Sequence, residues 1–345
     1  FLEEFPSRGH QLIFEGLNRA EVEPSNLDQK TKSWYVPKFE VLTEDPTAEV
    51  ILALRRFASA AFRREVSEDA IAPYLILFQG ELTKGFPFEE AYRTALAAIL
   101  CSPDFLYFKE SEGRLDDAAL ANRLSYFLTR TLPDKELRES VEREALASHP
   151  KTLLEHADRL MASSHFNRFI SDFLDGWLDL RDIEFTTPDE RLFPEFDLYL
   201  QDSMVAETQE FFRELIVSNH SVANLAKSDF SMLNWRLAEH YGIEGVTSPT
   251  VEKVSIPPGI PRGGLLSHGS ILKVSANGTN TSPVLRGGWI NERILGKHPA
   301  PPPPGIPGVE PDIRGAETIR ELLGQHRDSE SCQACHEMID PPGFA

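Results

Sequence analysis

Apolar residues recur three or four positions apart through the first two thirds of the chain, the spacing that places them on one face of an α-helix. The first such stretch follows Asp45, which can supply an N-cap, and it predicts a helix over 46–63. A second helix is predicted to begin at Ser67, and a third covers 88–101. The pattern therefore indicates consecutive helices rather than strands.

Helical spacing continues further along the chain. A fourth helix is predicted to end near Thr131, and Pro133 and Pro150 are placed to start two more. The apolar stripe over 166–180 predicts a helix with a buried face rather than a cofactor site. A shorter helix is then expected to be capped by Asp229 and to end at Gly242.

A long helix predicted over 196–217 places Glu207, Glu210 and Glu214 on one face. Three aligned acids suggest an acid/base or metal site as one hypothesis. A solvated charged face explains the same spacing, and no Glu-x-x-His motif accompanies the three residues. We therefore expect this face to be exposed to solvent.

The last third of the chain has a different composition. Residues 247–264, rich in Pro, Gly, Val and Ser, predict a linker with short extended pieces. A short apolar element is expected around His268, and a helix around 289–294. The run Pro301–Pro304 predicts a stiff polyproline connector, which a final helix over 316–323 follows. The fold class is thus mainly α, with multi-helix, bundle-like domains and a Pro-rich linker before the C-terminal segment.

That segment contains the motif Cys332-Gln-Ala-Cys335-His336. With this spacing, one helical turn presents both thiols to the haem vinyl groups while the histidine reaches the iron on the proximal side. The motif therefore predicts one covalently attached haem c. A zinc site or a plain dithiol remains the alternative, since His326 could complete a four-ligand zinc set with these three residues.

The sixth haem ligand is left open by the sequence. His326 lies six residues before Cys332, and His268 could come from a neighbouring element. Met338 is a poor candidate because it follows the proximal His336 too closely. An open iron, or a ligand from a part of the protein outside this chain, is the other possibility. The distinction matters because ligation by two histidines favours electron transfer, whereas an open site permits small-molecule or peroxide chemistry.

Charge and composition argue against two classes of protein, those that bind nucleic acids and those that span a membrane. The chain has 345 residues, and its net charge of −19 disfavours nucleic-acid binding, which requires clustered Lys and Arg. No apolar run approaches the length of a membrane-spanning helix. Cys101 lies in an apolar stretch and is expected to be a buried, inert thiol. The first residues have no secretory-signal pattern, and we expect the chain to be an internal fragment of a longer protein.

Several short blocks in matching order carry a resemblance to a known family: Arg55–Phe57, Ala61–Arg64, Ser102–Tyr107, Leu120–Leu128, Leu192–Phe196, Arg262–Leu266, Thr281–Pro283, Arg286–Gly287, Cys332–His336 and Ile339–Ala345. The chain resembles the planctomycete-type cytochrome proteins of unknown function, which are multi-domain and end in a haem-binding segment. The resemblance implies a haem, a location outside the cytoplasm and a larger parent protein.

Together these observations predict four segments. Residues 1–44 would be the remnant of an upstream domain or linker, 45–110 and 111–246 would be helical domains, and 247–345 would bind haem. We expect an extracytoplasmic electron-transfer module with a redox partner protein. A zinc-stabilised interaction module and a haem-dependent oxidoreductase acting on carbohydrate-related substrates are the alternatives. The sequence predicts neither a substrate nor an oligomeric state.

Overall fold

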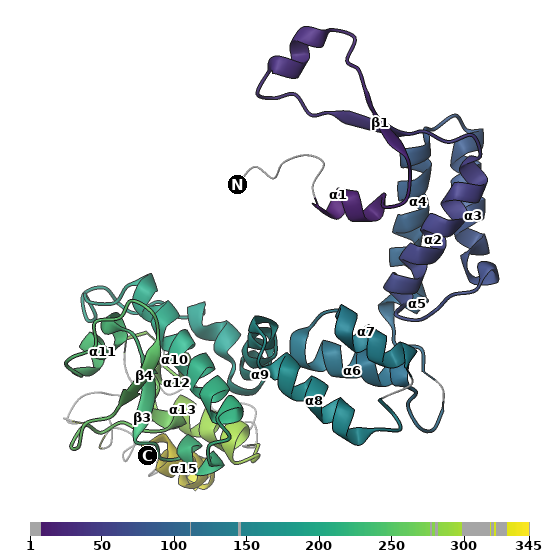
Figure 1. Ribbon diagram of the computed structural model, residues 1–345. Coiled ribbons are helices and arrows are strands. Elements are labelled where there is room, and N and C mark those ends of the chain that lie inside the picture. Colours follow the sequence, from purple (N-terminus) through teal and green to yellow (C-terminus); the bar gives the residue numbers. More distant parts are fainter. Residues whose placement is uncertain are drawn as a thin grey trace. The chain divides into compact units, whose positions relative to one another are not determined.

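The computed structural model describes residues 8–110, 112–143, 146–276, 278–279, 282–298, 318, 321 and 330–344. The fold is mainly α, as the hydrophobic pattern predicts, with two small antiparallel sheets in the described ranges (Figure 1). The expected polyproline connector, Pro301–Pro304, and most of the expected helix over 316–323 lie outside the described residues. The predicted division into four segments is not tested and stays a prediction.

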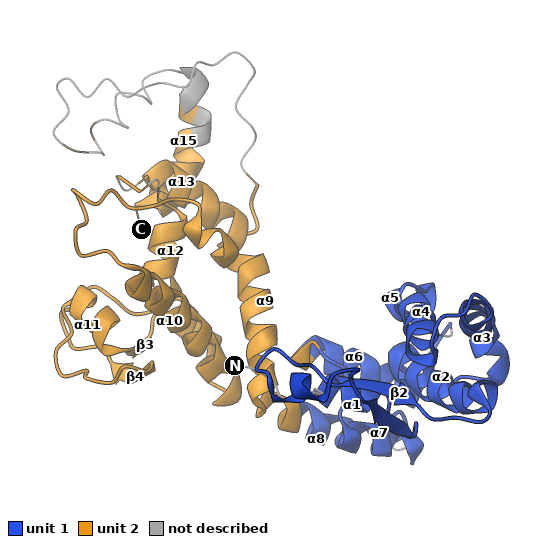
Figure 2. Ribbon diagram, turned by 90° about the horizontal axis from the view of Figure 1, so that it is seen from above, with its two compact units in different colours: residues 1–127, 131–157 blue, residues 128–130, 158–345 orange. Residues whose placement is uncertain are grey.

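The chain forms two compact units, residues 1–127 with 131–157, and residues 128–130 with 158–345 (Figure 2). The elements of the first unit are α1 (Arg8–Ile13), β1 (Arg19–Val22), η1 (Leu27–Thr31), β2 (Lys38–Val41), α2 (Pro46–Phe62), α3 (Glu68–Thr83), α4 (Phe88–Leu100), α5 (Pro103–Leu106), α6 (Asp117–Thr129) and α7 (Lys135–Glu142). The helix α8 (Pro150–Met161) runs from the first unit into the second.

In the first unit, α2, α3 and α4 pack side by side around one apolar core (Figure 1). The N-terminal segment also belongs to this core, because Phe14 is buried in it and contacts the ring of Tyr92 edge-on. Asp45 and Ser67 cap α2 and α3 as the sequence predicts, each accepting a bond from a backbone N–H. Cys101, however, is exposed, so the prediction of a buried thiol is wrong. It follows the last residue of α4 as its C-cap and turns away from the core.

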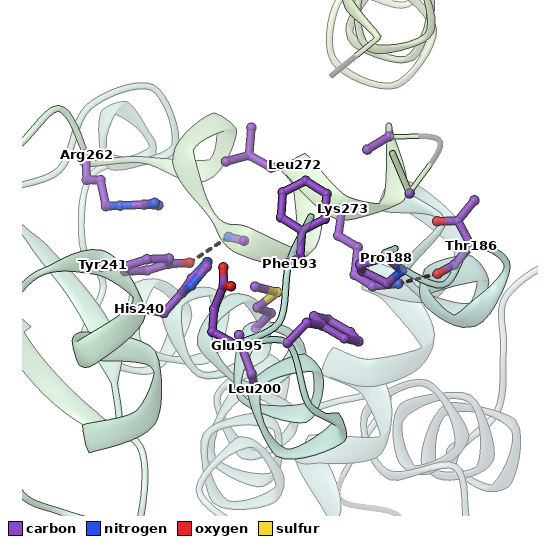
Figure 3. A pocket seen from close by; sticks show the side chains of 15 residues that line it. Thr186, Pro188, Phe193, Glu195, Leu200, His240, Tyr241, Arg262, Leu272 and Lys273 are labelled. Atoms are coloured by element: carbon purple, nitrogen blue, oxygen red, sulfur yellow. Dashed lines mark hydrogen bonds between the residues drawn. The ribbon is translucent and has the colours of Figure 1, made fainter. Parts of the chain in front are cut away.

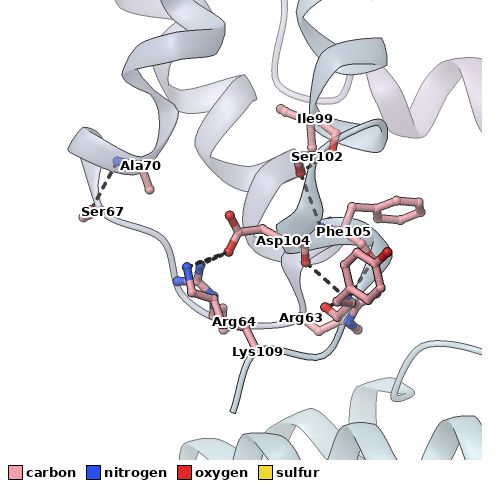
Figure 4. Close-up of polar contacts among 10 residues, drawn as sticks. Arg63, Arg64, Ser67, Ala70, Ile99, Ser102, Asp104, Phe105 and Lys109 are labelled. Atoms are coloured by element: carbon pink, nitrogen blue, oxygen red, sulfur yellow. Dashed lines mark hydrogen bonds and ion pairs between the residues drawn. The ribbon is translucent and has the colours of Figure 1, made fainter. Parts of the chain in front are cut away.

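Two blocks that carry the family resemblance meet in the first unit (Figure 4). Arg63, at the C-cap of α2, donates from Nη2 to the carbonyls of Asp104, Phe105 and Tyr107 at 3.3, 2.8 and 3.0 Å. Arg64 pairs with the carboxylate of Asp104 at 2.6 Å. These blocks therefore hold the end of α2 against α5 and have a structural role.

The second unit contains η2 (Ser164–Phe166), α9 (Asn167–Leu178), η3 (Leu180–Glu184), α10 (Leu198–Val217), η4 (Val222–Leu225), β3 (Phe230–Leu233), α11 (Trp235–Tyr241), β4 (Glu252–Ser255), η5 (Leu265–Ser267), α12 (Gly269–Val274), α13 (Pro283–Trp289), η6 (Ile290–Ile294) and α15 (Glu330–Gly343). The stripe on α9 is only partly core. Ile170 and Leu174 are buried, whereas Phe173 is 42% exposed and stacks on Phe169 and Phe212.

The predicted helix start at Asp229 is wrong. Residues 230–233 form the strand β3, which pairs with β4 and is buried at every position, and α11 is capped by Asn234 instead. Three of these four residues are apolar, and so short a stretch fits a strand as well as a helix, so periodicity could not separate the two. The predicted end at Gly242 is confirmed, since this residue has a φ of 69° at the C-cap.

Candidate functional site

The candidate site lies on α15, which is helical from Glu330 to Gly343. In a continuous helix, positions 332, 335 and 336 lie three and four residues apart and therefore share one face. The side chains of Cys332 and Cys335 lie outside the described part of the structure. The backbone alone thus places the three predicted ligands on the same side of one helical turn.

The imidazole of His336 has a buried carboxylate as its partner. Its Nδ1 lies 2.9 Å from Oδ1 of Asp340, one turn further along α15, and the two residues are 9% and 1% exposed. With Nδ1–H donating to the carboxylate, Nε2 is the ring nitrogen that can bind a metal. A carboxylate behind the ligating histidine is the common outer-shell arrangement of metal sites, where it fixes the ring orientation and raises the ligand's basicity. The donor set therefore fits a haem iron, and it fits zinc equally.

The carboxylate of Asp340 was not predicted as part of the site. The signal was available, since a histidine and an aspartate four residues apart on one helix are neighbours. Two prolines follow directly, at 341 and 342, and they obscured the continuation of the helix in the sequence. In the structure both prolines lie in the last turn of α15.

Close backbone contacts hold α15 against α13. A Cβ atom added to Gly287 would lie 1.8 Å from the carbonyl oxygen of Ile339, and one added to Gly343 would lie 1.9 Å from that of Pro283. The buried amide of Asn291 donates to the carbonyls of Gly287 and Met338 at 2.9 and 3.0 Å. Glycine at 287 and 343 therefore allows the two helices to pack backbone against backbone.

Of the two histidines predicted as possible distal ligands, His326 lies outside the described residues. His268 is fully buried at the start of α12, where its Nδ1 lies 3.0 Å from Oγ1 of Thr208 and its ring meets Phe211 edge-on. Its Nε2 has no hydrogen-bond partner among the described residues. The contacts of His268 are thus with α10, whereas α15 packs on α13 and η6. A role for His268 as sixth ligand stays a prediction.

Burial lowers the pKa of His268, and the positive charge of Arg262 acts in the same direction, while the carboxylate of Glu207 opposes both. The ring is therefore neutral at neutral pH. A neutral imidazole is compatible with a metal ligand and with a purely structural residue.

The prediction that the three acids of α10 are exposed to solvent is wrong for Glu207. Glu207 is 1% exposed and accepts hydrogen bonds from the hydroxyls of Ser231 and Tyr241 at 2.7 and 2.6 Å. Glu214 pairs with Lys253 and His220, and the bond from Lys253 contributes most to lowering the pKa of this carboxyl. The buried acid belongs to a polar network inside the second unit, which spacing along a single helix could not indicate.

The described residues contain neither a clustered metal site nor a membrane-spanning helix. No group of three or more His, Cys, Asp or Glu side chains in that part of the chain is arranged to hold a metal ion. None of its helices is long and apolar enough to cross a membrane.

Comparison with known proteins gave three matches to family models, each described as a protein of unknown function. They are PSD5 (DUF1595) over residues 51–110, PSD4 (DUF1592) over 115–243 and PSCyt3 (DUF1588) over 262–345. No curated protein and no solved structure matches the chain. The candidate site on α15 and the α13 surface beneath it both fall within the PSCyt3 match. The three matched models are the planctomycete cytochrome c-associated domains of unknown function, and this chain is similar to them in the order PSD5, PSD4, PSCyt3.

Proposed function

We propose that the chain is a c-type haem protein that transfers electrons outside the cytoplasm as one module of a larger redox protein. The observation that carries the proposal is the single helical turn of α15 that sets Cys332, Cys335 and His336 on one face. The pairing of His336 with the buried carboxylate of Asp340 supports it, as does the match of 262–345 to a cytochrome-related family model.

In this proposal Cys332 and Cys335 would hold the haem through their sulfur atoms, and Nε2 of His336 would be the protein ligand of the iron. The bound haem supplies reversible one-electron transfer. Asp340 is a positioning residue. It holds the buried imidazole of His336 through Nδ1 and makes this ring a stronger electron donor to a metal at Nε2. A stronger donor favours the oxidised iron, so Asp340 is expected to lower the reduction potential.

The compartment and the partner follow from the same chemistry. Haem attachment to this motif takes place outside the cytoplasm, so an attached haem requires export of the protein. The net charge of −19 favours a redox partner with a basic face, which would be steered to this chain by long-range attraction.

The absorption spectrum of the reduced protein and its intact mass test the proposal. The chain is produced in the periplasm of a host that attaches haem to c-type motifs. We expect a haem alpha band and a mass increase of one haem. A purified protein with no alpha band that contains stoichiometric zinc by elemental analysis would establish the zinc module instead.

A matched pair of charge changes on α15 then tests the role of Asp340. Asp340→Asn is expected to raise the midpoint potential in a redox titration. A neutral amide accepts the Nδ1–H bond of His336 less strongly than a carboxylate does, so the imidazole becomes a weaker ligand for oxidised iron. Glu337→Gln removes the same charge from an exposed position on the same helix and should leave the potential near that of the parent. Equal potentials for both variants would contradict a positioning role for Asp340.

A further inference from the structure

The second unit contains a cavity of about 210 Å³ that the haem proposal does not use. It lies among α10, α11, α12 and the segments that precede α10, with side chains from each reaching its wall (Figure 3). Most of the wall is apolar and includes Phe196, Leu200, Met204 and Leu272. The volume is below the roughly 300–1,000 Å³ of sites for drug-sized molecules, so the space suits a small ligand.

A buried lysine lines this cavity. Lys273 of α12 is 9% exposed, and its Nζ donates to the carbonyls of Ile183 and Thr186, the latter at 2.8 Å. No carboxylate forms an ion pair with it among the residues that the structure describes. Burial lowers the pKa of Lys273, and the more distant Glu184 opposes that effect. The ammonium is thus hydrogen-bonded only to neutral oxygens and lies 5.6 Å from the centroid of the Phe196 ring, contacts that compensate its charge incompletely.

A second cation is present at the wall. The guanidinium of Arg262 lies 3.4 Å from the centroid of the Tyr241 ring and donates to the carbonyl of Ser267 at 2.6 Å. It also has no ion-pair partner in the described ranges. Figure 3 shows Arg262 and Lys273 at separate parts of the wall, with Glu195 between them. Two cations and one carboxylate line this wall, and the buried Glu207, which accepts a hydrogen bond from Tyr241, places a second carboxylate directly behind it.

The carboxylate of Glu207 is already hydrogen-bonded to protein groups, one of which belongs to the wall. The hydroxyl of Tyr241 donates to Glu207 at 2.6 Å and accepts from the backbone N–H of Gly269 at 2.7 Å. Burial and the nearby carboxylate raise the pKa of Tyr241 well above its usual value, so the phenol stays neutral. Glu195 is exposed and therefore screened by water.

We propose that this cavity binds a small organic carboxylate, with the carboxylate group at Lys273 and an apolar ring against Phe196 and Leu272. A ligand anion would supply the counter-charge that the protein does not place beside Lys273, and a charge-assisted hydrogen bond is stronger than a neutral one. The apolar wall accepts the ring by excluding water from it. This inference does not depend on the haem, since none of its residues belongs to α15.

Isothermal titration calorimetry of the full chain tests the proposal with three probes of similar shape: benzoate, the neutral benzamide and the cationic benzylamine. We expect benzoate to bind at least about tenfold more tightly than either of the others, the factor expected for one charge-assisted hydrogen bond. Absence of benzoate binding at millimolar concentration, or equal binding of benzamide, would overturn the inference.

Variants locate the binding. Lys273→Met should weaken benzoate binding by about tenfold or more, whereas Lys227→Met, at an exposed position in the same unit, should not change it. Because Lys273→Met also removes bonds to two carbonyls, Ala276→Phe is the second variant. It fills the cavity from its wall and leaves both cations in place, and it should abolish binding. Unchanged benzoate affinity in a folded Ala276→Phe protein would place the bound molecule elsewhere and refute the site.

Discussion

Replacement of Gly287 by alanine is expected to separate α13 from the helix that bears His336. The added Cβ would lie 1.8 Å from the carbonyl oxygen of Ile339, whereas real Cβ contacts essentially never fall below 3.0 Å. The clashing atom belongs to the backbone, so rotating a side chain cannot relieve the clash. The helices must therefore move apart by more than 1 Å, the distance needed to bring the contact from 1.8 Å to 3.0 Å. Overpacking of this kind costs about 1–3 kcal/mol, partly offset by the roughly 0.5–1 kcal/mol that alanine gains over glycine in a helix.

Gly288→Ala is the matched control for this change. The neighbouring glycine on the same helix has no atom within 4 Å of its added Cβ, so this variant receives the helix-propensity gain without the clash. Urea unfolding should therefore show the 287 variant as the less stable by about 1–3 kcal/mol, together with faster hydrogen exchange of the 330–343 amides. Equal stability of the two variants, or unchanged exchange in α15 of the 287 variant, would refute the close packing of the two backbones.

Two further predictions concern the interior of each unit. The lowered pKa of His268 means that the unfolded chain takes up its proton near pH 6.5 while the folded ring does so only at lower pH. Stability of the second unit should fall as the pH drops below this value, by up to about 1.4 kcal/mol per pH unit, and urea unfolding of His268→Gln should lack this slope; a slope equal to that of the parent would contradict the assignment. In the first unit, Arg63 has a φ of 60° and three carbonyl partners, so Arg63→Ala should cost about 1–3 kcal/mol in urea unfolding. Arg63→Gly relieves the left-handed backbone and should be about 1 kcal/mol less damaging than Arg63→Ala; the reverse order would contradict the strain at this position.

Several helices of this chain could be predicted from its sequence because they bury one face and begin or end at a residue with a specific backbone role, whereas the short α1 has no buried residue and gives no such signal. Asp45 and Ser67 act as N-caps through side-chain oxygens, a local property of the chain. The strand β3 could not be predicted, because its identity depends on pairing with β4, which lies about twenty residues further along. Local patterns thus predicted these helices, whereas the strand β3 depends on pairing with a distant segment.

The candidate site was predictable only in part for the same reason. The spacing of Cys332, Cys335 and His336 is visible in five consecutive residues of the sequence, and these residues lie on one helix in the structure. The burial of Glu207 depends on Ser231 and Tyr241, which come from other elements, so the expectation of a solvated acid was wrong. The cavity around Lys273 is likewise assembled from segments far apart in the chain.

The contact between Gly287 and Ile339 has a consequence for how a cofactor would be captured. It joins protein backbone to protein backbone, so the orientation of α15 does not depend on any bound group. A ligand helix that is already oriented loses little conformational entropy when His336 binds a metal, and less of the binding free energy is spent on ordering the chain. In this protein the glycines of α13, which ligate nothing, would therefore contribute to the affinity of the site by keeping the helix that bears His336 in place.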